Sequence, residues 1–274
     1  MGNTKIISFI NMKGGVGKTT ITINIADTLV RHFKKNVLVI DMDPQFNATQ
    51  ALFTKFSKIS EYEELRKQRK TIASVVTENT GGGVAMEAQP YTHEDLIVQL
   101  HYTDNANKLY LIPGDLELIA YESSRRGAEK ILSSFIEENV LPNYDLDYIL
   151  IDTPATYSIY SQAALLASNY YLVPIAPDVF STLGYSLLNK IMSKDYALRG
   201  HEINNIGIVF TLCKEEKHGR RAIQESFGDS PQFENKISEY ERVRTGKLST
   251  LMYDMERSKD EIVNLCAEFI SKAI

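Results

Sequence analysis

The stretch KIISFINMKGGVGKTT, residues 5–20, decides the fold class of this 274-residue chain. A short apolar run rich in β-forming residues stops at a glycine-rich turn, and apolar residues recur at helical spacing after Lys18. In such an arrangement, the backbone N–H groups of the turn and the positive end of the helix can bind the same anion. The stretch predicts a phosphate-binding loop, and a glycine turn that only joins a strand to a helix is the less favoured interpretation.

Two lysines belong to this loop. Lys18 is expected to reach the β- and γ-phosphates of a nucleotide, and the Thr19 hydroxyl is expected to ligate Mg²⁺. The usual spacing G-x-x-x-x-G-K-[ST] is not met, since its first glycine falls at Met12, and a second lysine, Lys13, stands directly before the glycines. The candidate nucleotide-binding residues are Lys13, Gly14, Gly15, Val16, Gly17, Lys18, Thr19 and Thr20.

Carboxylates follow two further apolar runs. VIDMDPQ, residues 39–45, carries Asp41 and Asp43, and DYILIDTPA ends its apolar run at Asp152. Carboxylates at the carboxyl ends of buried strands lie where ligands bind in open α/β sheets. These three acids are therefore candidates for activating a water molecule or binding Mg²⁺. A purely structural alternative is that Asp43 caps a helix beginning near Pro44.

The remaining apolar runs predict the architecture. Residues 36–41, 148–152, 170–175 and 206–212 are continuously apolar rather than alternating, as in strands that are covered on both faces, and helix-length segments at 158–168 and 181–198 separate them. We therefore expect an α/β fold with a doubly wound, mostly parallel sheet flanked by helices. Residues 1–274 are predicted to form a single domain, with a helical or loop insertion at about 53–109 lying over the surface.

The loop KGGVGKTT resembles the deviant Walker A motif KGGxGK[ST] of the ParA/MinD family of P-loop ATPases, and the likeness covers residues 4–52 and about 145–247. The resemblance implies that Lys13 crosses a nucleotide-sandwich dimer to the partner's phosphates, whereas the residues alone also allow an exposed lysine at a strand end. A cation contributed by a second subunit would neutralise charge on the phosphoryl group in the way that an arginine finger does.

The same resemblance assigns roles to the other residues. It implies catalytic roles for Lys13, Lys18 and Asp43, with Asp43 orienting the attacking water, and Mg²⁺ bound near Thr19, Asp41 and Asp152. ATP and Mg²⁺ are the cofactors it implies. The sequence departs from the family at Phe46, where relatives often have glycine, and at Glu234, where relatives commonly have the proline of an Ile-Pro pair near the adenine.

Composition limits the partners. The net charge is −5 and the sequence pI is about 5.6, so no overall positive field draws the protein to nucleic acid or to an anionic membrane. The two cysteines, Cys213 and Cys266, form no CxxC pair and suggest neither a disulfide framework nor an iron–sulfur site, which favours a reducing, cytoplasmic setting. The apolar stripe of the C-terminal helix is predicted to pack on the sheet rather than on a membrane, because acids match its lysines.

Within the family, the sequence looks most like partition ATPases of the ParA/Soj type. That likeness implies a homodimer on ATP binding, nonspecific DNA as a track, a centromere-binding partner of the ParB type, and a nucleoid-associated location. Between Lys214 and Lys247 there are eight basic and seven acidic residues, and ERVRTGK, residues 241–247, is the best candidate for contacts with DNA phosphates. The alternative is a nucleotide-switch regulator or positioning protein that does not use DNA as its track.

Overall fold

The computed structural model describes residues 4–77, 92–100, 102, 106–124, 127–178, 180–213, 225–240 and 250–273. Its centre is a seven-stranded sheet in the order β3-β4-β2-β5-β1-β6-β7. All neighbouring strands pair in parallel except β3 with β4. The strands are β1 (Lys5–Phe9), β2 (Val37–Asp41), β3 (Val98–Leu100), β4 (Leu109–Ile112), β5 (Tyr148–Asp152), β6 (Tyr170–Ile175) and β7 (Asn204–Phe210). The doubly wound α/β prediction is confirmed, with an antiparallel edge strand added.

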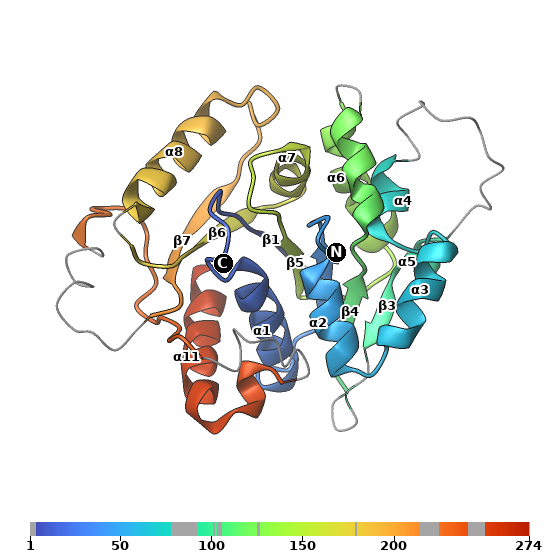
Figure 1. The fold of residues 1–274 in the computed structure, drawn as a ribbon, viewed down its shortest axis with the longest axis horizontal. Coiled ribbons are helices and arrows are strands. Elements are labelled where there is room, and N and C mark those ends of the chain that lie inside the picture. The colour runs from blue at the N-terminus through green and yellow to red at the C-terminus, as the bar shows by residue number, and fades with distance from the viewer. Residues whose placement is uncertain are drawn as a thin grey trace.

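Helices cover both faces of the sheet (Figure 1). The helices of the described residues are α1 (Lys18–Arg31), α2 (Asn47–Lys55), α3 (Ile59–Lys67), α4 (Ile72–Thr77), α5 (His93–Leu96), α6 (Ile131–Phe135), α7 (Ile159–Leu166), α8 (Ser181–Lys194) and α11 (Glu256–Lys272). Short 3₁₀ segments are η2 (Leu116–Ser123), η3 (Ala128–Lys130) and η5 (Met252–Asp254), and a π-helical turn, η4 (Ile136–Val140), continues α6.

Successive side chains of the buried strands pack against the helices on opposite faces of the sheet. In β5, Leu150 points into the core that α1 and α11 cover, whereas Ile149 and Ile151 point into the core on the other face with α6 and α7. Both sides are apolar because successive side chains of a strand leave opposite faces of a sheet. A smaller apolar cluster under α8 covers β6 and β7. This packing fixes the strand ends at which the polar motifs emerge.

The segment predicted to be a surface insertion, 53–109, is built more deeply into the fold than the sequence indicated. It contributes the edge strand β3, and α4 buries Ile72, Val75 and Val76 in the core. The β3 run of three residues is too short to register as a strand by pattern alone. Residues 78–91 of this segment lie outside the described residues.

The C-terminal helix packs as predicted. Ile262, Leu265 and Phe269 are fully buried on the face of α11 that meets the sheet, and the Phe269 ring lies 5.7 Å from that of Tyr148 in β5. Helix α11 lies beside α1 under the sheet (Figure 1). The apolar stripe of this helix is therefore used inside the fold.

Candidate nucleotide-binding site

The glycine-rich turn joins β1 to α1 at the carboxyl edge of the sheet. Gly15 and Gly17 adopt positive φ angles of 70° and 82°, a backbone conformation that L side chains rarely adopt, so these two positions require glycine. Gly17 precedes α1 and has no side chain with which to cap it. The first N–H groups of α1 are therefore left to bind an anion, as the sequence predicted.

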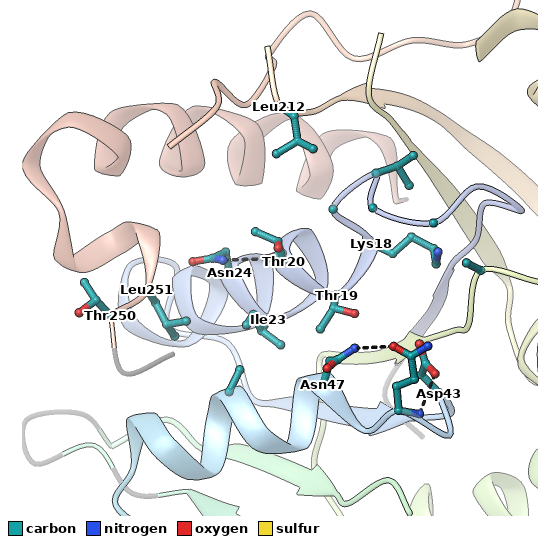
Figure 2. A pocket seen from close by; sticks show the side chains of 17 residues that line it. Lys18, Thr19, Thr20, Ile23, Asn24, Asp43, Asn47, Leu212, Thr250 and Leu251 are labelled. Carbon is teal, nitrogen blue, oxygen red and sulfur yellow. Dashed lines mark hydrogen bonds between the residues drawn. The ribbon is translucent and has the colours of Figure 1, made fainter. Parts of the chain in front are cut away.

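A cavity of about 420 Å³ opens over this turn (Figure 2). Its wall contains every predicted loop residue from Gly14 to Thr20, together with Asp43. The other lining residues are Ile23, Asn24, Gln45, Asn47, Ala51, Ala155, Leu212, Thr250 and Leu251. The volume is in the range of pockets that enclose small-molecule ligands and cofactors.

Lys18 is almost completely buried at the phosphate end of the cavity, with 7% of its surface exposed. Burial lowers the pKa of the Lys18 amine, while the carboxylates of Asp152 and Asp43 act in the opposite direction. The Thr19 hydroxyl donates a 2.6 Å hydrogen bond to Asp152 Oδ2. The structure thus brings the lysine, the hydroxyl and two of the predicted acids together.

Asp41 and Asp152 stand side by side, because β2 and β5 pair in the register that aligns them. Both carboxyls are fully buried, and burial is the largest cause that raises the pKa of Asp41 to about 7 and of Asp152 to about 8. The negative charge of a neighbouring carboxylate raises both further. The nucleotide-free site therefore favours the protonated acids, whereas a bound divalent cation would favour their charged forms.

Asp41 is turned toward α2 rather than toward the cavity. Asp41 Oδ2 accepts hydrogen bonds from the Thr49 backbone N–H (2.8 Å) and hydroxyl (2.7 Å), and the Thr49 hydroxyl in turn accepts one from the Gly114 N–H. A Cβ at Gly114 would lie 2.9 Å from the Asp41 carboxyl carbon, so only glycine fits there. Asp41 ties α2 and the segment after β4 to the end of β2, and its role as a metal ligand stays a prediction.

Asp43 lines the cavity opposite the phosphate loop (Figure 2). Its Oδ1 accepts a hydrogen bond from the Gln45 N–H at 2.9 Å, and α2 begins only at Asn47 with Phe46 at the N-cap. Asp43 therefore lies outside the cap position of that helix. No group of the described residues donates a hydrogen bond to its Oδ2, so one carboxylate oxygen is available to a water or ligand.

Phe46, which stands where relatives often have glycine, keeps the left-handed backbone conformation that the loop before α2 requires. Its backbone keeps a left-handed conformation with φ of 43°, which costs a non-glycine residue about 1–2 kcal/mol. The Phe46 ring packs at 5.3 Å from the ring of Tyr62, whose hydroxyl donates to the Gly114 carbonyl. The aromatic contact offsets the backbone strain and holds the start of α2 in place.

Lys13 lies on the rim rather than in the cavity. Its Nζ forms an ion pair with Asp178 Oδ2, in the loop between β6 and α8, and 43% of its side chain is exposed. The Lys13 backbone N–H donates to Asn11 Oδ1, and Asn11 donates to the Pro174 carbonyl. The loop's second lysine is thus held away from the protein's own phosphate-binding turn, and its catalytic role stays a prediction.

Sequence reasoning missed the far end of the cavity. Asn24, four residues after Thr20 on α1, donates to the Thr20 carbonyl at 2.7 Å and accepts from the Met252 N–H at 2.6 Å. That bridge holds Thr250 and Leu251 in the cavity wall, to which Leu212 also belongs (Figure 2). Leu212 could have been found as the last residue of a predicted strand, but no signal in the sequence connects residues 250–252 with α1.

Glu234, where relatives commonly have the proline of an Ile-Pro pair near the adenine, holds the C-terminal helix here together with its neighbour Asn235. The backbone N–H groups of Glu234 and Asn235 donate to the Glu268 carboxylate of α11, at 2.8 and 3.0 Å. Neither residue lines the cavity. The far end is lined by Ile23, Leu212 and Leu251, which are apolar and suit the faces of a base.

The donor set fits Mg²⁺ bound together with a nucleotide. Among the described residues no group of three or more His, Cys, Asp or Glu side chains could hold a metal ion by itself. Thr19 and the buried Asp152 supply oxygens beside the anion-binding turn, and Mg²⁺ usually takes one or two carboxylates, with phosphates and waters completing its shell. The chemistry of the site therefore matches a Mg²⁺ nucleotide.

A family model described as an AAA domain matches residues 4–201, which is most of the chain. The virulence plasmid ParA family protein pGP5-D of Chlamydia psittaci is 27% identical over 285 aligned positions, covering 98% of this chain and 95% of that protein. The chain belongs to the ParA/MinD family. The matched residues 4–201 include the loop KGGVGKTT, on which the resemblance to this family is based.

Two solved structures show the same fold. A plasmid partition protein from Borrelia burgdorferi B31, bound to AMPPNP, is 23% identical with a TM-score of 0.78, covering 98% of this chain and 100% of that one. Cobyrinic acid a,c-diamide synthase from Mycobacterium smegmatis, with an ATP analogue and magnesium, is 18% identical with a TM-score of 0.74, covering 97% and 94%. The predicted cofactors of this ParA/MinD protein, ATP and Mg²⁺, agree with these ligands.

A membrane-bound positioning ATPase is a further possibility within the family, which the sequence disfavours because acids match the lysines of the C-terminal helix. No helix of the described residues has both the length and the apolar composition required to cross a bilayer.

The basic cluster predicted to contact DNA, residues 241–247, lies outside the described residues, as do Lys214, Lys217, Arg220 and Arg221.

Proposed function

We propose that this ParA/MinD protein is a partition ATPase: it binds Mg-ATP, closes into a homodimer around two nucleotides, and in that state binds DNA without sequence preference. ATP is hydrolysed slowly, and a centromere-binding partner of the ParB type stimulates hydrolysis. The position of Lys13 carries this proposal. The lysine is exposed on the rim, paired with Asp178 and outside its own cavity, so its ammonium group can serve a second subunit.

The chain's own residues have distinct tasks in this reaction. The glycine turn and the start of α1 bind the β- and γ-phosphates, and Lys18 neutralises them from within the pocket. Thr19 and Asp152 would hold Mg²⁺, which screens the charge of the phosphates when bound. Asp43 orients the attacking water, and Lys13 of the partner subunit neutralises the charge that develops on the transferred phosphoryl group.

Replacing the rim lysine tests the proposal directly. Lys13→Ala should keep nucleotide affinity in the monomer but lose ATP-dependent dimerisation, and turnover should fall by about a thousandfold, in the range measured for arginine fingers. Dimerisation is measured by analytical ultracentrifugation with ADP and with ATP. Lys35→Ala is the matched control, since Lys35 is a half-exposed lysine paired with Asp147 at the opposite edge of the sheet.

A mixing experiment separates action across the dimer from action within one chain. A Lys13→Ala protomer mixed with an Asp43→Ala protomer forms heterodimers in which one composite site contains both native residues. If Lys13 acts on the partner's nucleotide, the mixture recovers turnover that neither variant has alone. If mixing restores nothing while both variants still bind ATP and associate, Lys13 acts within its own subunit and the sandwich mechanism is wrong.

The DNA track is tested by fluorescence anisotropy with random-sequence duplex across a salt series. ATP-dependent binding that weakens steeply with salt is expected, because each neutralised phosphate releases counterions. Binding that stays undetectable with an Asp43→Ala variant held in the ATP state would rule out DNA as the track. The nucleotide-switch regulator or positioning protein would then be the better account of the same ATP site.

A further inference from the structure

The outer face of α8 is apolar, and its large side chains are left exposed by the part of the chain that the structure describes. Phe180, Leu183 and Leu187 are 70%, 60% and 44% exposed, and their spacing of three and four residues places them on one stripe of the helix. The opposite face buries Tyr185 and Leu188 in the core over β6 and β7. A contiguous stripe of large exposed apolar side chains on a folded protein marks an interaction site.

A groove continues this stripe where α8 ends. It measures about 590 Å³ and is lined by Leu187, Ile191 and Tyr196 on one side and by Tyr157 and Gln162 on the other. Helices α7 and α8 lie next to each other on the same face of the sheet, with α8 at the outside of the molecule (Figure 1). An apolar floor of this kind fits the side chains of a peptide or helix.

Two lysines line the groove and an arginine stacks on one of its tyrosines, while Asp195, the acid in its lining, is bonded to Tyr157 and Gln162. Lys190 and Lys194 lie on the exposed side of α8, and the Arg199 guanidinium lies 3.9 Å from the centre of the Tyr196 ring. None of the three forms an ion pair with an acidic side chain of the described residues. Unpaired positive charge beside an apolar stripe, on a chain with net charge −5, favours a partner that offers acids beside its own apolar side chains.

Both ends of α8 are attached to the loops of the nucleotide site. At its start, Asp178 Oδ1 accepts from the Phe180 N–H (3.0 Å) and the Ser181 hydroxyl (2.9 Å), while Asp178 Oδ2 pairs with Lys13. The carboxylate that orders the first turn of α8 is therefore also the partner of the rim lysine. A change in the position of Lys13 changes the charge beside that turn.

At the other end, Asp195 closes the helix and reaches the loop that follows β5. Asp195 Oδ2 accepts from the Tyr157 hydroxyl at 2.6 Å and from Gln162 Nε2 at 2.8 Å. Tyr157 lies five residues after Asp152, and Ala155 between them lines the nucleotide cavity. The end of α8 is thus one hydrogen bond away from the loop beside the nucleotide.

We propose that the stripe and groove of α8 form a docking surface for an acidic amphipathic helix of another protein, and that this docking is coupled to the nucleotide through Asp178 and Asp195. Duplex DNA offers phosphates for the cations but no apolar face for Phe180 and Leu183. A second copy packed through this same face about a twofold axis would bring the two sets of cations together. The coupling rests on the proposed ATP site, whereas the docking surface does not.

Selection of displayed peptides tests the docking surface. A library of 18-residue helical peptides carries apolar residues at i, i+3, i+4 and i+7 and a free choice of Glu, Lys or Ser at the flanking positions. The full-length protein is the target, and the Leu183→Asp/Leu187→Asp variant serves for counter-selection. We expect binders enriched in Glu, whose affinity falls at least about tenfold in that variant, as for central apolar anchors of an interface.

Matched variants identify the residues that determine the affinity for the selected peptide. Lys190→Glu/Lys194→Glu should weaken the selected peptide about threefold to tenfold and reduce its sensitivity to salt, since rim charges act mainly through steering. Leu116→Asp/Ile119→Asp changes another pair of exposed apolar residues, on η2, and should leave the affinity unchanged. Circular dichroism verifies that all variants are folded.

Three results would overturn the docking proposal. The first is the recovery of only neutral or basic peptides, or of none that depends on Leu183 and Leu187. The second is a loss of random-duplex binding in Lys190→Glu/Lys194→Glu with none in Leu183→Asp/Leu187→Asp, which would make the surface a DNA site. The third is a loss of self-association in Leu183→Asp/Leu187→Asp, which would make it an interface between copies of this chain.

The coupling between peptide docking on α8 and the bound nucleotide is measured separately. The selected peptide should bind the ATP-bound and ADP-bound protein with affinities that differ by about fivefold or more, and Tyr157→Phe, which lacks the hydroxyl that bonds Asp195, should reduce this ratio toward one. Equal affinities in the native protein would overturn the coupling. Direct titration of ATP without peptide reports separately on the proposed ATP site, so the two failures are distinguishable.

Discussion

The two ends of the nucleotide cavity are built in different ways. At the phosphate end, short loops at the carboxyl ends of β1, β2 and β5 bring Lys18, Asp43 and Asp152 together. At the far end, Asn24 of α1 accepts a hydrogen bond from the Met252 N–H, and Arg31 of α1 pairs with Asp254, so that Thr250 and Leu251 form the wall together with Leu212. The first end is charged and fixed by the sheet, whereas the second is mostly apolar and fixed by side chains of α1 that bond the C-terminal segment.

This difference separates recognition of phosphate from recognition of the base. Strand register aligns the acids with the glycine turn, so their geometry is set by the backbone of the core. The far wall depends on a hydrogen bond between residues that are 228 positions apart in the chain. Changes at the phosphate end should therefore abolish binding or chemistry, while changes at the far end should tune affinity.

The largest effect is expected for Lys18→Ala. Removing the buried ammonium leaves Asp43, Asp152 and the nucleotide phosphates without their cation, and ATP affinity should fall by about a thousandfold, since loss of one partner of a buried charge pair costs about 2–5 kcal/mol. Isothermal titration calorimetry measures the affinity. Lys35→Ala should bind as the native protein does, and an unchanged affinity in Lys18→Ala would place the phosphates elsewhere.

Asp43→Asn should affect turnover rather than binding. Asparagine keeps an oxygen that can accept from the Gln45 N–H but cannot take a proton from water, so turnover should fall by about a hundredfold with little change in ATP affinity. Single-turnover hydrolysis measures the effect. Turnover equal to that of the native protein would mean that Asp43 only shapes the loop, because Asn and Asp serve equally well in that task.

Asn24→Ala should weaken ATP binding about tenfold and leave the rate of hydrolysis at saturation nearly unchanged. The variant leaves the Met252 N–H without its partner, which costs about 1–3 kcal/mol and loosens Thr250 and Leu251. Titration of ATP and GTP measures affinity and base preference together. A fall in saturated turnover as large as that of Asp43→Asn would erase the distinction between the two ends.

The smallest effect is a pH dependence of stability in the nucleotide-free protein. Burial raises the pKa of Asp41 to about 7 and of Asp152 to about 8, from 3.8. The folded protein then holds these protons more tightly than the unfolded chain, so the stability they contribute is complete below the unfolded pKa and is lost as pH rises through the folded values. The thermal midpoint should fall by a few degrees between about pH 5.5 and about pH 8.5.

Differential scanning fluorimetry measures this slope. Asp152→Asn has no carboxyl to titrate and should show a shallower slope than the native protein. A native midpoint that rises over the same interval, with an identical curve for the variant, would contradict the assignment of protons to this pair.

Local motifs allowed the phosphate end to be predicted from sequence. Lys18 and Thr19 follow a glycine turn after an apolar run, and Asp43 and Asp152 follow buried strands, so a few neighbouring residues specify each position. Asn24 and Leu251 could not be predicted in this way, because their contact requires the C-terminal segment to pack along α1. The edge strand β3 was missed for a related reason: its three residues acquire a strand conformation by pairing with β4.

The sequence by itself determined the α/β class, the phosphate loop, and the acids that face it, since all of these depend on periodicity and on spacing within a few residues. Only the tertiary structure decided that Asp41 is bonded to Thr49, that Lys13 is paired with Asp178, and that α8 presents an exposed apolar face. Each of these is a contact or an exposure produced by elements distant in the chain. Such relations are set by packing, and no local pattern encodes them.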